Sequence, residues 1–325
     1  MPTEQPLLVL LRPLGLGDFL TAVPAYRALA RAFPGHRRVL AAPIFLEPLA
    51  RLTSDVDAVV DTAAHEPLGP QLQRADIAID LHGKGPRSHR VLLAASPKRM
   101  IAWHNAQVPQ SRGMPRWRQD EHEVSRWCRL LSQSGVWADP GELDVPPPPL
   151  AAPAAARGAT LIHPGAASPA RCWPPDRWAA VARAELQSGR RVVFTGDATE
   201  RARAELIAAA SGAQRCTVLA GQTDLLELAS LVANAATVLC ADTGVAHLAT
   251  ALGTPSIVLF GPTSPAHWGP PADRPHHRVL WSGRTGDPHG LSCDRGLLDI
   301  TPADVLAELT ALRSAHPVGA AQTAV

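Results

Sequence analysis

One aspartate, Asp18, follows an apolar run and two glycines near the start of the sequence. Residues 7–11 read LLVLL, which is typical of a buried strand, and Gly15 and Gly17 allow a tight turn before the carboxylate. Ligands bind in loops at the carboxyl ends of strands in open α/β sheets, so an acid here could serve as a general base. The alternative, favoured when the segment is taken alone, is that Asp18 caps the helix that follows.

A second segment of interest, Asp242-Thr243-Gly244, lies between an apolar run and a helical pattern. The first N–H groups of a helix have no partner within it and carry partial positive charge, which suits a phosphate. His247 lies one turn further on and could face the same site. The structural alternative is a helix cap with a glycine needed for packing, and a lone helical histidine is more often structural.

Two further strand ends in the C-terminal half carry polar groups. Arg171 follows the predicted strand at 160–163 across a loop of small residues, and its guanidinium could donate paired hydrogen bonds to a diphosphate. Thr195, Gly196 and Glu200 follow the next predicted strand, where an acid either binds ribose hydroxyls or favours the helix dipole. The alternative for Arg171 is that it is simply an exposed arginine in a loop. Together, the polar groups at these three strand ends suggest that the C-terminal half binds a nucleotide donor.

Apolar runs and helical patterns alternate along the chain, which predicts parallel α/β sheets. Strands are predicted at 7–11, 39–42, 58–60, 76–81, 99–102, 160–163, 191–195, 237–241 and 255–260. Helices are predicted at 18–33, 120–132, 175–187, 200–210, 224–233 with Thr223 as its cap, 244–252, and from 302 onwards.

A proline-rich stretch at 139–153, with four consecutive prolines at 146–149, separates the two halves and predicts a semi-rigid spacer. We therefore expect an N-terminal domain over 1–140, a linker over 141–157 and a C-terminal domain over 158–325. The Pro-, Gly- and His-rich stretch at 266–294 matches no pattern, and its histidines at 276 and 277 are expected in a solvated loop.

Composition narrows the function classes. The formal net charge is +2 and the basic residues are spread along the chain, which gives no electrostatic case for nucleic acid. The five cysteines show no C-x-x-C and the histidines no metal-binding spacing, so we expect no metal and a reducing cytoplasm. No apolar run approaches the ~18–20 residues that span a bilayer. A dinucleotide fingerprint would need glycine where Leu20 stands, so we expect no cofactor.

These motifs, and their order along the chain, resemble those of glycosyltransferase family 9, which includes the ADP-heptose:lipopolysaccharide heptosyltransferases. The matching stretches are LGLGD at 14–18 with Thr21 and Pro24, IDLHG at 79–83, HPG at 163–165 leading to Arg171 and WP at 173–174, Gly196 with Glu200, DTGVAH at 242–247, and FGPT at 260–263.

The resemblance implies a GT-B fold: two Rossmann-like domains facing across a cleft. It implies metal-independent transfer, with inversion, of a heptose-like sugar from an ADP-linked nucleoside-diphosphate donor to a glycan or glycolipid hydroxyl; a glycolipid acceptor would allow peripheral membrane contact. Asp18 corresponds to the general base, and the donor would be bound by Arg171, Thr195, Gly196, Glu200, Asp242, Thr243, Gly244 and His247. The acceptor side would hold Gly17, Thr21, His82 and Lys84.

The chain departs from the family at one place that bears on the acceptor. The family often has apolar residues after the glycine at 83, whereas this sequence continues Lys84-Gly85-Pro86-Arg87. Two other functions remain open: a non-catalytic nucleotide-sugar-binding protein and a sugar-nucleotide epimerase of the same fold. A base facing the acceptor argues against pure binding, and an epimerase would need more acids around the anomeric centre.

Overall fold

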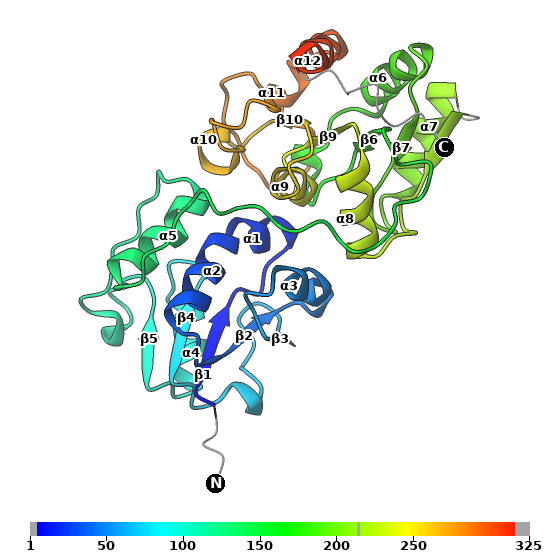
Figure 1. Cartoon of the computed structure of the whole chain (residues 1–325). Helices are drawn as coiled ribbons and strands as arrows, with labels where there is room; N and C mark the ends of the chain where they lie inside the picture. Colours follow the sequence, from blue (N-terminus) through cyan, green and yellow to red (C-terminus); the bar gives the residue numbers. More distant parts are fainter. Residues whose placement is uncertain (1–4, 213–214, 316–325) are drawn as a thin grey trace. The chain divides into compact units, whose positions relative to one another are not determined.

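The computed structural model describes residues 5–212 and 215–315. The chain forms two compact units, residues 1–146 and 147–325, which divide within the run of four prolines (Figure 1). Each unit contains one parallel sheet flanked by helices, which confirms the prediction of two Rossmann-like α/β domains.

The N-terminal unit contains a five-stranded sheet in the order β3-β2-β1-β4-β5. Its strands are β1 (Leu7–Leu11), β2 (Arg37–Ala42), β3 (Ala58–Asp61), β4 (Ile77–Asp80) and β5 (Arg99–Ile101). Its helices are α1 (Leu16–Thr21), α2 (Val23–Ala32), α3 (Glu47–Thr53), α4 (Arg87–Ala94) and α5 (Glu123–Gln133). From β1 the chain continues to β2 and β3 on one side of the sheet, and from β4 it continues to β5 on the other side. The loops that follow these two strands therefore diverge at one point of the sheet edge, where ligands of such sheets bind.

The helix predicted at 18–33 is two helices, α1 and α2. Pro24 lies in the first turn of α2 and has no N–H to continue the hydrogen-bond series of α1. Instead, the N–H of Ala22 bonds to the carbonyl of Phe19 at 3.1 Å. The N-cap of α1 is Gly15, so Asp18 is the third residue of this helix and not its cap.

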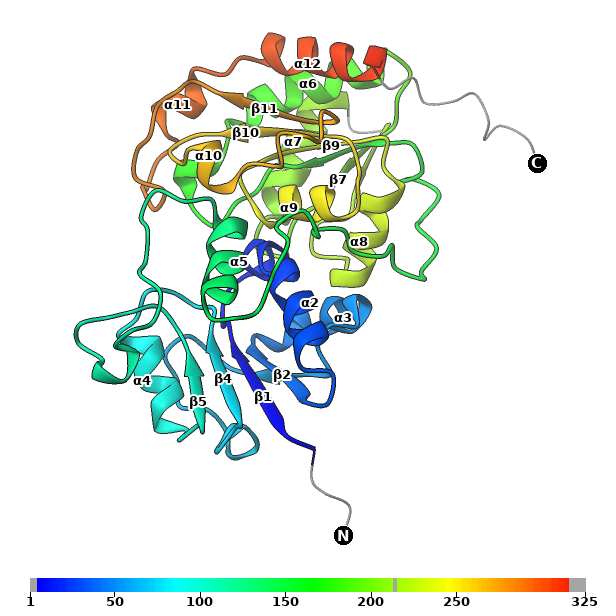
Figure 2. The same ribbon diagram turned by 60° about the vertical axis from the view of Figure 1, so that its left-hand side comes forward.

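The C-terminal unit contains a six-stranded parallel sheet in the order β11-β10-β9-β6-β7-β8. Its strands are β6 (Thr160–His163), β7 (Val192–Phe194), β8 (Cys216–Val218), β9 (Thr237–Ala241), β10 (Ser256–Phe260) and β11 (His277–Trp281). Its helices are α6 (Pro175–Gln187), α7 (Arg201–Gly212), α8 (Leu225–Asn234), α9 (Gly244–Ala251), α10 (Pro265–Trp268), α11 (Arg295–Leu298) and α12 (Pro302–Ala315). Figure 2 shows α6 and α12 on one side of this sheet and α8 and α9 on the other.

The structure corrects two predictions in the C-terminal unit. Helix α8 is capped by Asp224, whose carboxylate accepts from the N–H of Glu227 at 2.8 Å while Glu227 bonds back to the cap, so Thr223 is not the cap. His277 is not in a solvated loop, because it begins β11, is buried and bonds through Nδ1 to Ser256 at 2.9 Å.

One buried carboxylate, Glu185 of α6, connects three elements of the C-terminal unit. It bonds to the Thr160 hydroxyl, to Arg190 at 2.9 Å and to Arg313 of α12 at 3.0 Å. Burial alone would raise the pKa of this carboxyl, but its hydrogen bonds to Arg313, Arg190 and Thr160 lower the pKa to about 2. The charged form is therefore stabilised only in the folded state.

We expect this carboxylate to make the stability of the protein depend on pH. Because the folded pKa lies below the unfolded one, its contribution is present above about pH 5 and is lost as the pH falls towards 2. The arginines are partly exposed, so the loss should be about 2 kcal/mol. Urea unfolding of wild type and Glu185→Gln from pH 6 to 3 measures it. The exposed Glu205→Gln is the control, and equal pH slopes in all three proteins would contradict the assignment.

Candidate active site

Arg12 directly follows β1, and its side chain is only 1% exposed. Its Nε donates to the carbonyl of Asp18 at 2.6 Å, and Nη1 donates to the carbonyl of Leu81, just beyond β4. Nη2 donates to the Thr21 hydroxyl at 3.2 Å, and this hydroxyl in turn donates to the Asp18 carbonyl at 3.0 Å. One guanidinium therefore connects the loop after β1 to the loop after β4, and Thr21 is a buried part of that connection.

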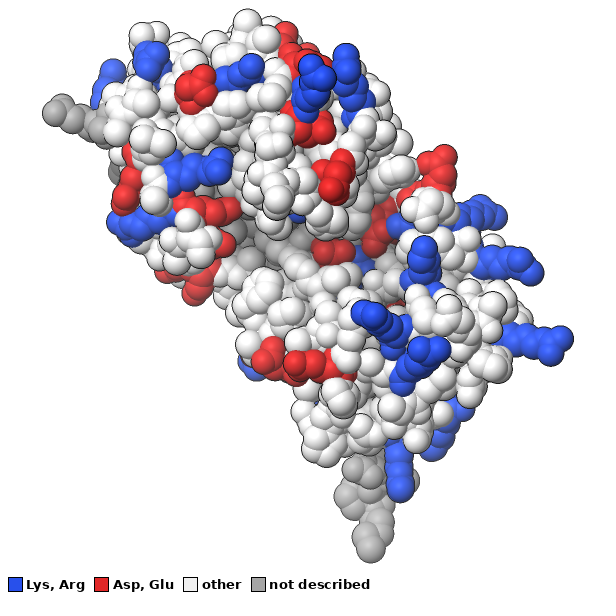
Figure 3. Space-filling model, turned by 180° about the vertical axis from the view of Figure 1, so that it is seen from behind, with Lys and Arg blue, Asp and Glu red and all other residues white. Residues whose placement is uncertain are grey.

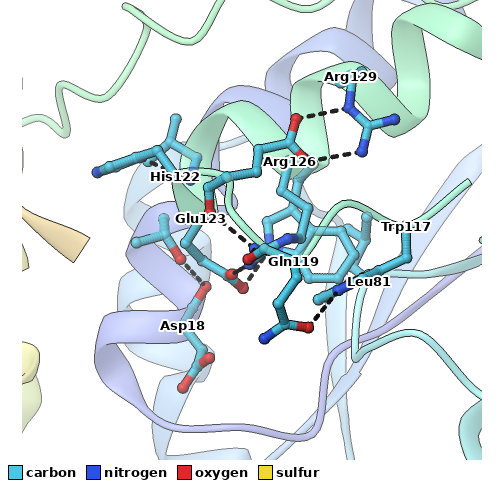
Figure 4. A network of polar contacts seen from close by, with 12 residues as sticks. Asp18, Leu81, Trp117, Gln119, His122, Glu123, Arg126 and Arg129 are labelled. Carbon is cyan, nitrogen blue, oxygen red and sulfur yellow. Dashed lines mark hydrogen bonds and ion pairs between the residues drawn. The ribbon is translucent and has the colours of Figure 1, made fainter. Parts of the chain in front are cut away.

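Glu123, in the first turn of α5, supplies the countercharge for Arg12. Its carboxylate lies 3.2 Å from Arg12 Nη2, accepts from Trp127 Nε1 at 2.8 Å and pairs with Arg126. The guanidinium of Arg12 also lies over the Trp127 ring, 4.7 Å from its centroid. Figure 4 shows Asp18 beside this network, in which α5 contributes Glu123 and Arg126.

The Asp18 carboxylate lies next to this network and is 28% exposed, with Oδ1 3.6 Å from Arg12 Nη2. Burial raises its pKa, the Arg12 charge lowers the pKa, and the Glu123 charge raises it again, with a net shift upward. A carboxyl with a raised pKa that still reaches solvent is a better proton acceptor than an ordinary aspartate. The geometry is therefore compatible with a general base.

A buried pair holds the loop that carries His82 and Lys84. Asp80 accepts from His89 Nδ1 at 2.7 Å and from the N–H of His82 at 2.9 Å, while His89 Nε2 bonds to the carbonyl of Trp103 at 2.7 Å. Burial alone would lower the pKa of His89, but the bond to Asp80 raises it. His82 and Lys84 both line a pocket of about 460 Å³ within the N-terminal unit.

In the C-terminal unit, β6 and β9 are neighbours at the point where the strand order reverses, with His163 opposite Cys240. Arg171 reaches from the loop after β6 and donates through Nη1 to the carbonyl of Asp242 at 3.2 Å. Its Nε is buried and bonds to no protein atom in the described residues. Burial raises the pKa of Asp242 to about 6, although Arg171 and Thr263 act to lower it.

The start of α9 leaves its first N–H groups available. Thr243 is the N-cap residue in an extended conformation, but its side chain makes no capping hydrogen bond. Gly244 is the first helical residue, and His247 is half-buried with its ring 5.9 Å from that of Trp268. An anion at this helix end would meet free N–H donors beside Arg171.

Glu200 lies over two glycine backbones at the ends of β6 and β7. A Cβ added to Gly165 would lie 1.8 Å from Glu200 Oε1, so only glycine fits there while the carboxylate keeps this position. Oε2 accepts from the N–H of Asp197 at 2.9 Å and lies 3.7 Å from His163 Nε2. A Cβ on Gly196 would lie 3.0 Å from the same carboxylate. Thr195 is fully buried and its hydroxyl bonds to His163 Nδ1 at 3.1 Å.

The structure thus brings together Asp18, Gly17 and Thr21 in one unit, and Arg171 with Asp242, Thr243 and Gly244 in the other. Sequence reasoning missed Arg12 and Glu123 as partners of Asp18. A signal for Arg12 existed, because a charged residue directly after five apolar strand residues is rarely left unpaired when it is buried. No local signal pointed to Glu123, which is 111 residues away in sequence.

Residues 68–287 match the family model for glycosyltransferase family 9 (heptosyltransferase). The chain belongs to glycosyltransferase family 9. No curated protein sequence gives a significant match. The family match begins at residue 68, after Asp18, and therefore does not include the candidate base.

Solved heptosyltransferase structures share the fold of this family 9 protein. E. coli ADP-heptose lps heptosyltransferase II is 25% identical, with a TM-score of 0.75 over 96% of this chain and 99% of its own. E. coli heptosyltransferase WaaC with ADP is 20% identical, with a TM-score of 0.71 over 94% and 99%. The same enzyme with ADP-2-deoxy-2-fluoro heptose is 19% identical, with a TM-score of 0.70 and the same coverage. These matches confirm the predicted GT-B fold.

Within 5–212 and 215–315, no three His, Cys, Asp or Glu side chains lie close enough together to hold a metal ion. Over the same residues, the helices are too short or too polar to cross a bilayer.

The network around Asp18 predicts a measurable change in its pKa. Glu123→Gln removes a negative charge beside Asp18, so the pKa of Asp18 should fall below its wild-type value. A carboxyl-detected NMR titration measures this directly. Glu142→Gln, which removes a carboxylate paired with the partly exposed Arg31, is the control and should leave the pKa unchanged. An unchanged Asp18 pKa in Glu123→Gln would show that the two carboxylates are not coupled.

Proposed function

We propose that the protein transfers a heptose-like sugar from an ADP-linked donor to a hydroxyl of a glycan or glycolipid, with inversion and without a required metal. The observation that supports this most directly is the position of Asp18. It is a partly exposed carboxylate with a raised pKa, fixed through its own backbone by a buried arginine at the carboxyl edge of β1. A residue needed only as a helix cap would not require such surroundings.

Each unit supplies groups for one part of the proposed reaction. Asp18 accepts the proton of the acceptor hydroxyl as the oxygen attacks the anomeric carbon from the face opposite the leaving group. The bond from that carbon to the diphosphate oxygen then breaks, and the nucleotide leaves with the electron pair. Arg171 and the N–H groups at the start of α9 stabilise the charge that develops on the phosphate oxygens.

Both the chemistry of the C-terminal site and the ligands of solved relatives support an ADP-linked donor. The unpartnered Nε of Arg171 and the uncapped start of α9 suit a diphosphate, and Glu200 keeps one carboxylate oxygen free to accept from ribose hydroxyls. E. coli WaaC has been solved with ADP and with an ADP-heptose analogue. An ADP-linked heptose is therefore the donor to test first.

The role of Asp18 is tested by Asp18→Asn, which is nearly isosteric. If the carboxylate is the base, this variant should keep its fold and its affinity for ADP but lose about 10² to 10⁴ in transfer rate. The wild-type rate should also decline as the pH falls through the raised pKa of Asp18, because the protonated acid cannot accept a proton. Rates of donor consumption, with circular dichroism and calorimetric ADP binding, provide the measurements.

Asp61→Asn is the matched control, because Asp61 is an exposed aspartate at the carboxyl end of the nearby strand β3. It should turn over at the wild-type rate. Unchanged turnover in Asp18→Asn would instead favour a protein that binds nucleotide sugars without transferring them.

The donor site is tested by Arg171→Ala and Arg171→Lys. The alanine variant should bind ADP about ten- to a hundredfold more weakly, since a hydrogen bond to a charged group contributes about 1.5–3 kcal/mol. Lysine keeps the charge but loses the planar fork, so it should restore part of the affinity. Calorimetry measures both, with the exposed Arg201→Ala on α7 as the control. Equal affinity in wild type and Arg171→Ala would exclude this arginine from the site.

A further inference from the structure

His163 is the last residue of β6, is buried, and presents its two ring nitrogens to different partners. Nδ1 bonds at 3.1 Å to the hydroxyl of Thr195, which directly follows the neighbouring strand β7. Nε2 lies 3.7 Å from Oε2 of Glu200, in the loop that leads from β7 to α7. One imidazole therefore connects a buried hydroxyl to the carboxylate that lies over Gly165, and no step of the proposed transfer uses it.

The protonation state of His163 follows from its surroundings. Burial lowers the pKa of the imidazole more than the charges of Glu200 and Asp197 raise it, so the ring is neutral at neutral pH and carries one N–H. A carboxylate can only accept a hydrogen bond, whereas a hydroxyl can also donate one. Both neighbours are satisfied when Nε2 carries the proton and Nδ1 accepts from the Thr195 hydroxyl.

Glu200 has few other partners. Its Oε2 accepts from the N–H of Asp197 at 2.9 Å, and Oε1 accepts no hydrogen bond within the described residues. Over the same residues, no lysine or arginine lies within ion-pair distance of this carboxylate. Figure 3 shows a different situation at the surface of the C-terminal unit, where Asp and Glu side chains lie beside Lys or Arg. Glu200 is therefore held by neutral donors and not by a countercharge.

The backbone around Glu200 leaves space for its carboxylate. A Cβ at Gly165 would lie 1.8 Å from Oε1 and a Cβ at Gly196 would lie 3.0 Å from Oε2, so the two glycines open this space. Fixing a glutamate side chain costs rotamer entropy, and that cost weakens ligand binding unless the protein has already met it. The Nε2–H of His163 attracts Oε2 and favours the orientation in which Oε1, the oxygen without a protein partner, remains for a ligand.

We propose that His163 is a positioning residue for Glu200, and that Thr195 holds the imidazole in the orientation this requires. The inference rests on the proposed function, in which Glu200 accepts from the ribose hydroxyls of the donor. His163 then acts through Glu200 and does not itself touch the nucleotide. Its contribution should therefore appear only with nucleotides that carry ribose hydroxyls.

The test compares ADP with 2′,3′-dideoxy-ADP, which lacks both ribose hydroxyls, by calorimetry on the full chain. Wild type should bind ADP at least about tenfold more tightly than the dideoxy analogue, because a hydrogen bond to a charged group is lost in the analogue. Glu200→Ala should bring this ratio close to one. His163→Asn keeps a nitrogen near the position of Nδ1 but loses Nε2, so the ratio should fall about two- to tenfold while affinity for the analogue stays unchanged.

Two further variants separate positioning from a merely structural role. His163→Gln places an amide nitrogen near the position of Nε2, so it should recover part of the ratio. Thr195→Val removes the hydroxyl that orients the ring and should lower the ratio in the same direction as His163→Asn. Equal weakening of both nucleotides in His163→Asn, or a ratio that stays at the wild-type value, would overturn the positioning role.

His277→Asn is the matched control, because His277 is also buried and also bonds through Nδ1 to a hydroxyl, that of Ser256 at 2.9 Å. Its Nε2 has no partner among the described residues. His277 begins β11 whereas His163 ends β6, so the two histidines lie at opposite edges of the same parallel sheet. This variant should keep the wild-type ratio, and an equal fall in the control would overturn the assignment to His163.

The imidazole nitrogen shifts of His163, measured by NMR in the free protein, provide an independent readout. We expect a protonated Nε2 and an unprotonated Nδ1 at neutral pH, and the opposite tautomer would overturn the inference. The proposed function fails separately: a protein that shows the expected ratios but transfers no sugar would keep the positioning role and lose the transferase. Normal transfer by a protein whose ratio is unchanged in His163→Asn would do the reverse.

Discussion

The buried guanidinium of Arg12 is the interaction on which the rest of the N-terminal site depends. A charge removed from water is tolerated only when its hydrogen bonds and its countercharge are supplied within the protein. Here the partners come from three separate segments: the carbonyl of Asp18 on α1, the carbonyl of Leu81 after β4, and the carboxylate of Glu123 on α5. Satisfying this one charge therefore fixes the relative positions of all three segments.

The same constraint sets the character of Asp18. Arg12 bonds to its backbone and to Glu123 more closely than to its carboxylate, and burial together with the Glu123 charge outweighs the lowering effect of Arg12 on the pKa of Asp18. The carboxylate consequently keeps the raised pKa that burial gives it. A direct, short ion pair with Arg12 would have lowered that pKa and weakened the group as a proton acceptor.

The two units place their polar groups by the same rule of topology but compensate charge differently. In each sheet these groups follow neighbouring strands where the order reverses, β1 and β4 in one, β6 and β9 in the other. Near Asp18 the arginines of the network are paired with glutamates, whereas Glu200 has no lysine or arginine partner among the described residues. Paired charges maintain the structure, and unpaired ones are available to a ligand.

The sequence alone determined the α/β alternation, most of the strands and the polar residues that follow them, although it did not predict the edge strands β8 and β11. Strand β6 and helix α6 begin and end at the predicted residues, because apolar runs, prolines and helix periodicity are local signals. Tertiary structure alone decided which of those residues meet. The pairing of Arg12 with Glu123, the fit of Glu200 over Gly165 and the pocket at Lys84 all join segments far apart in sequence or depend on how loops pack. Local propensity is short-ranged, whereas charge compensation depends on strand order and on which loops that order brings together.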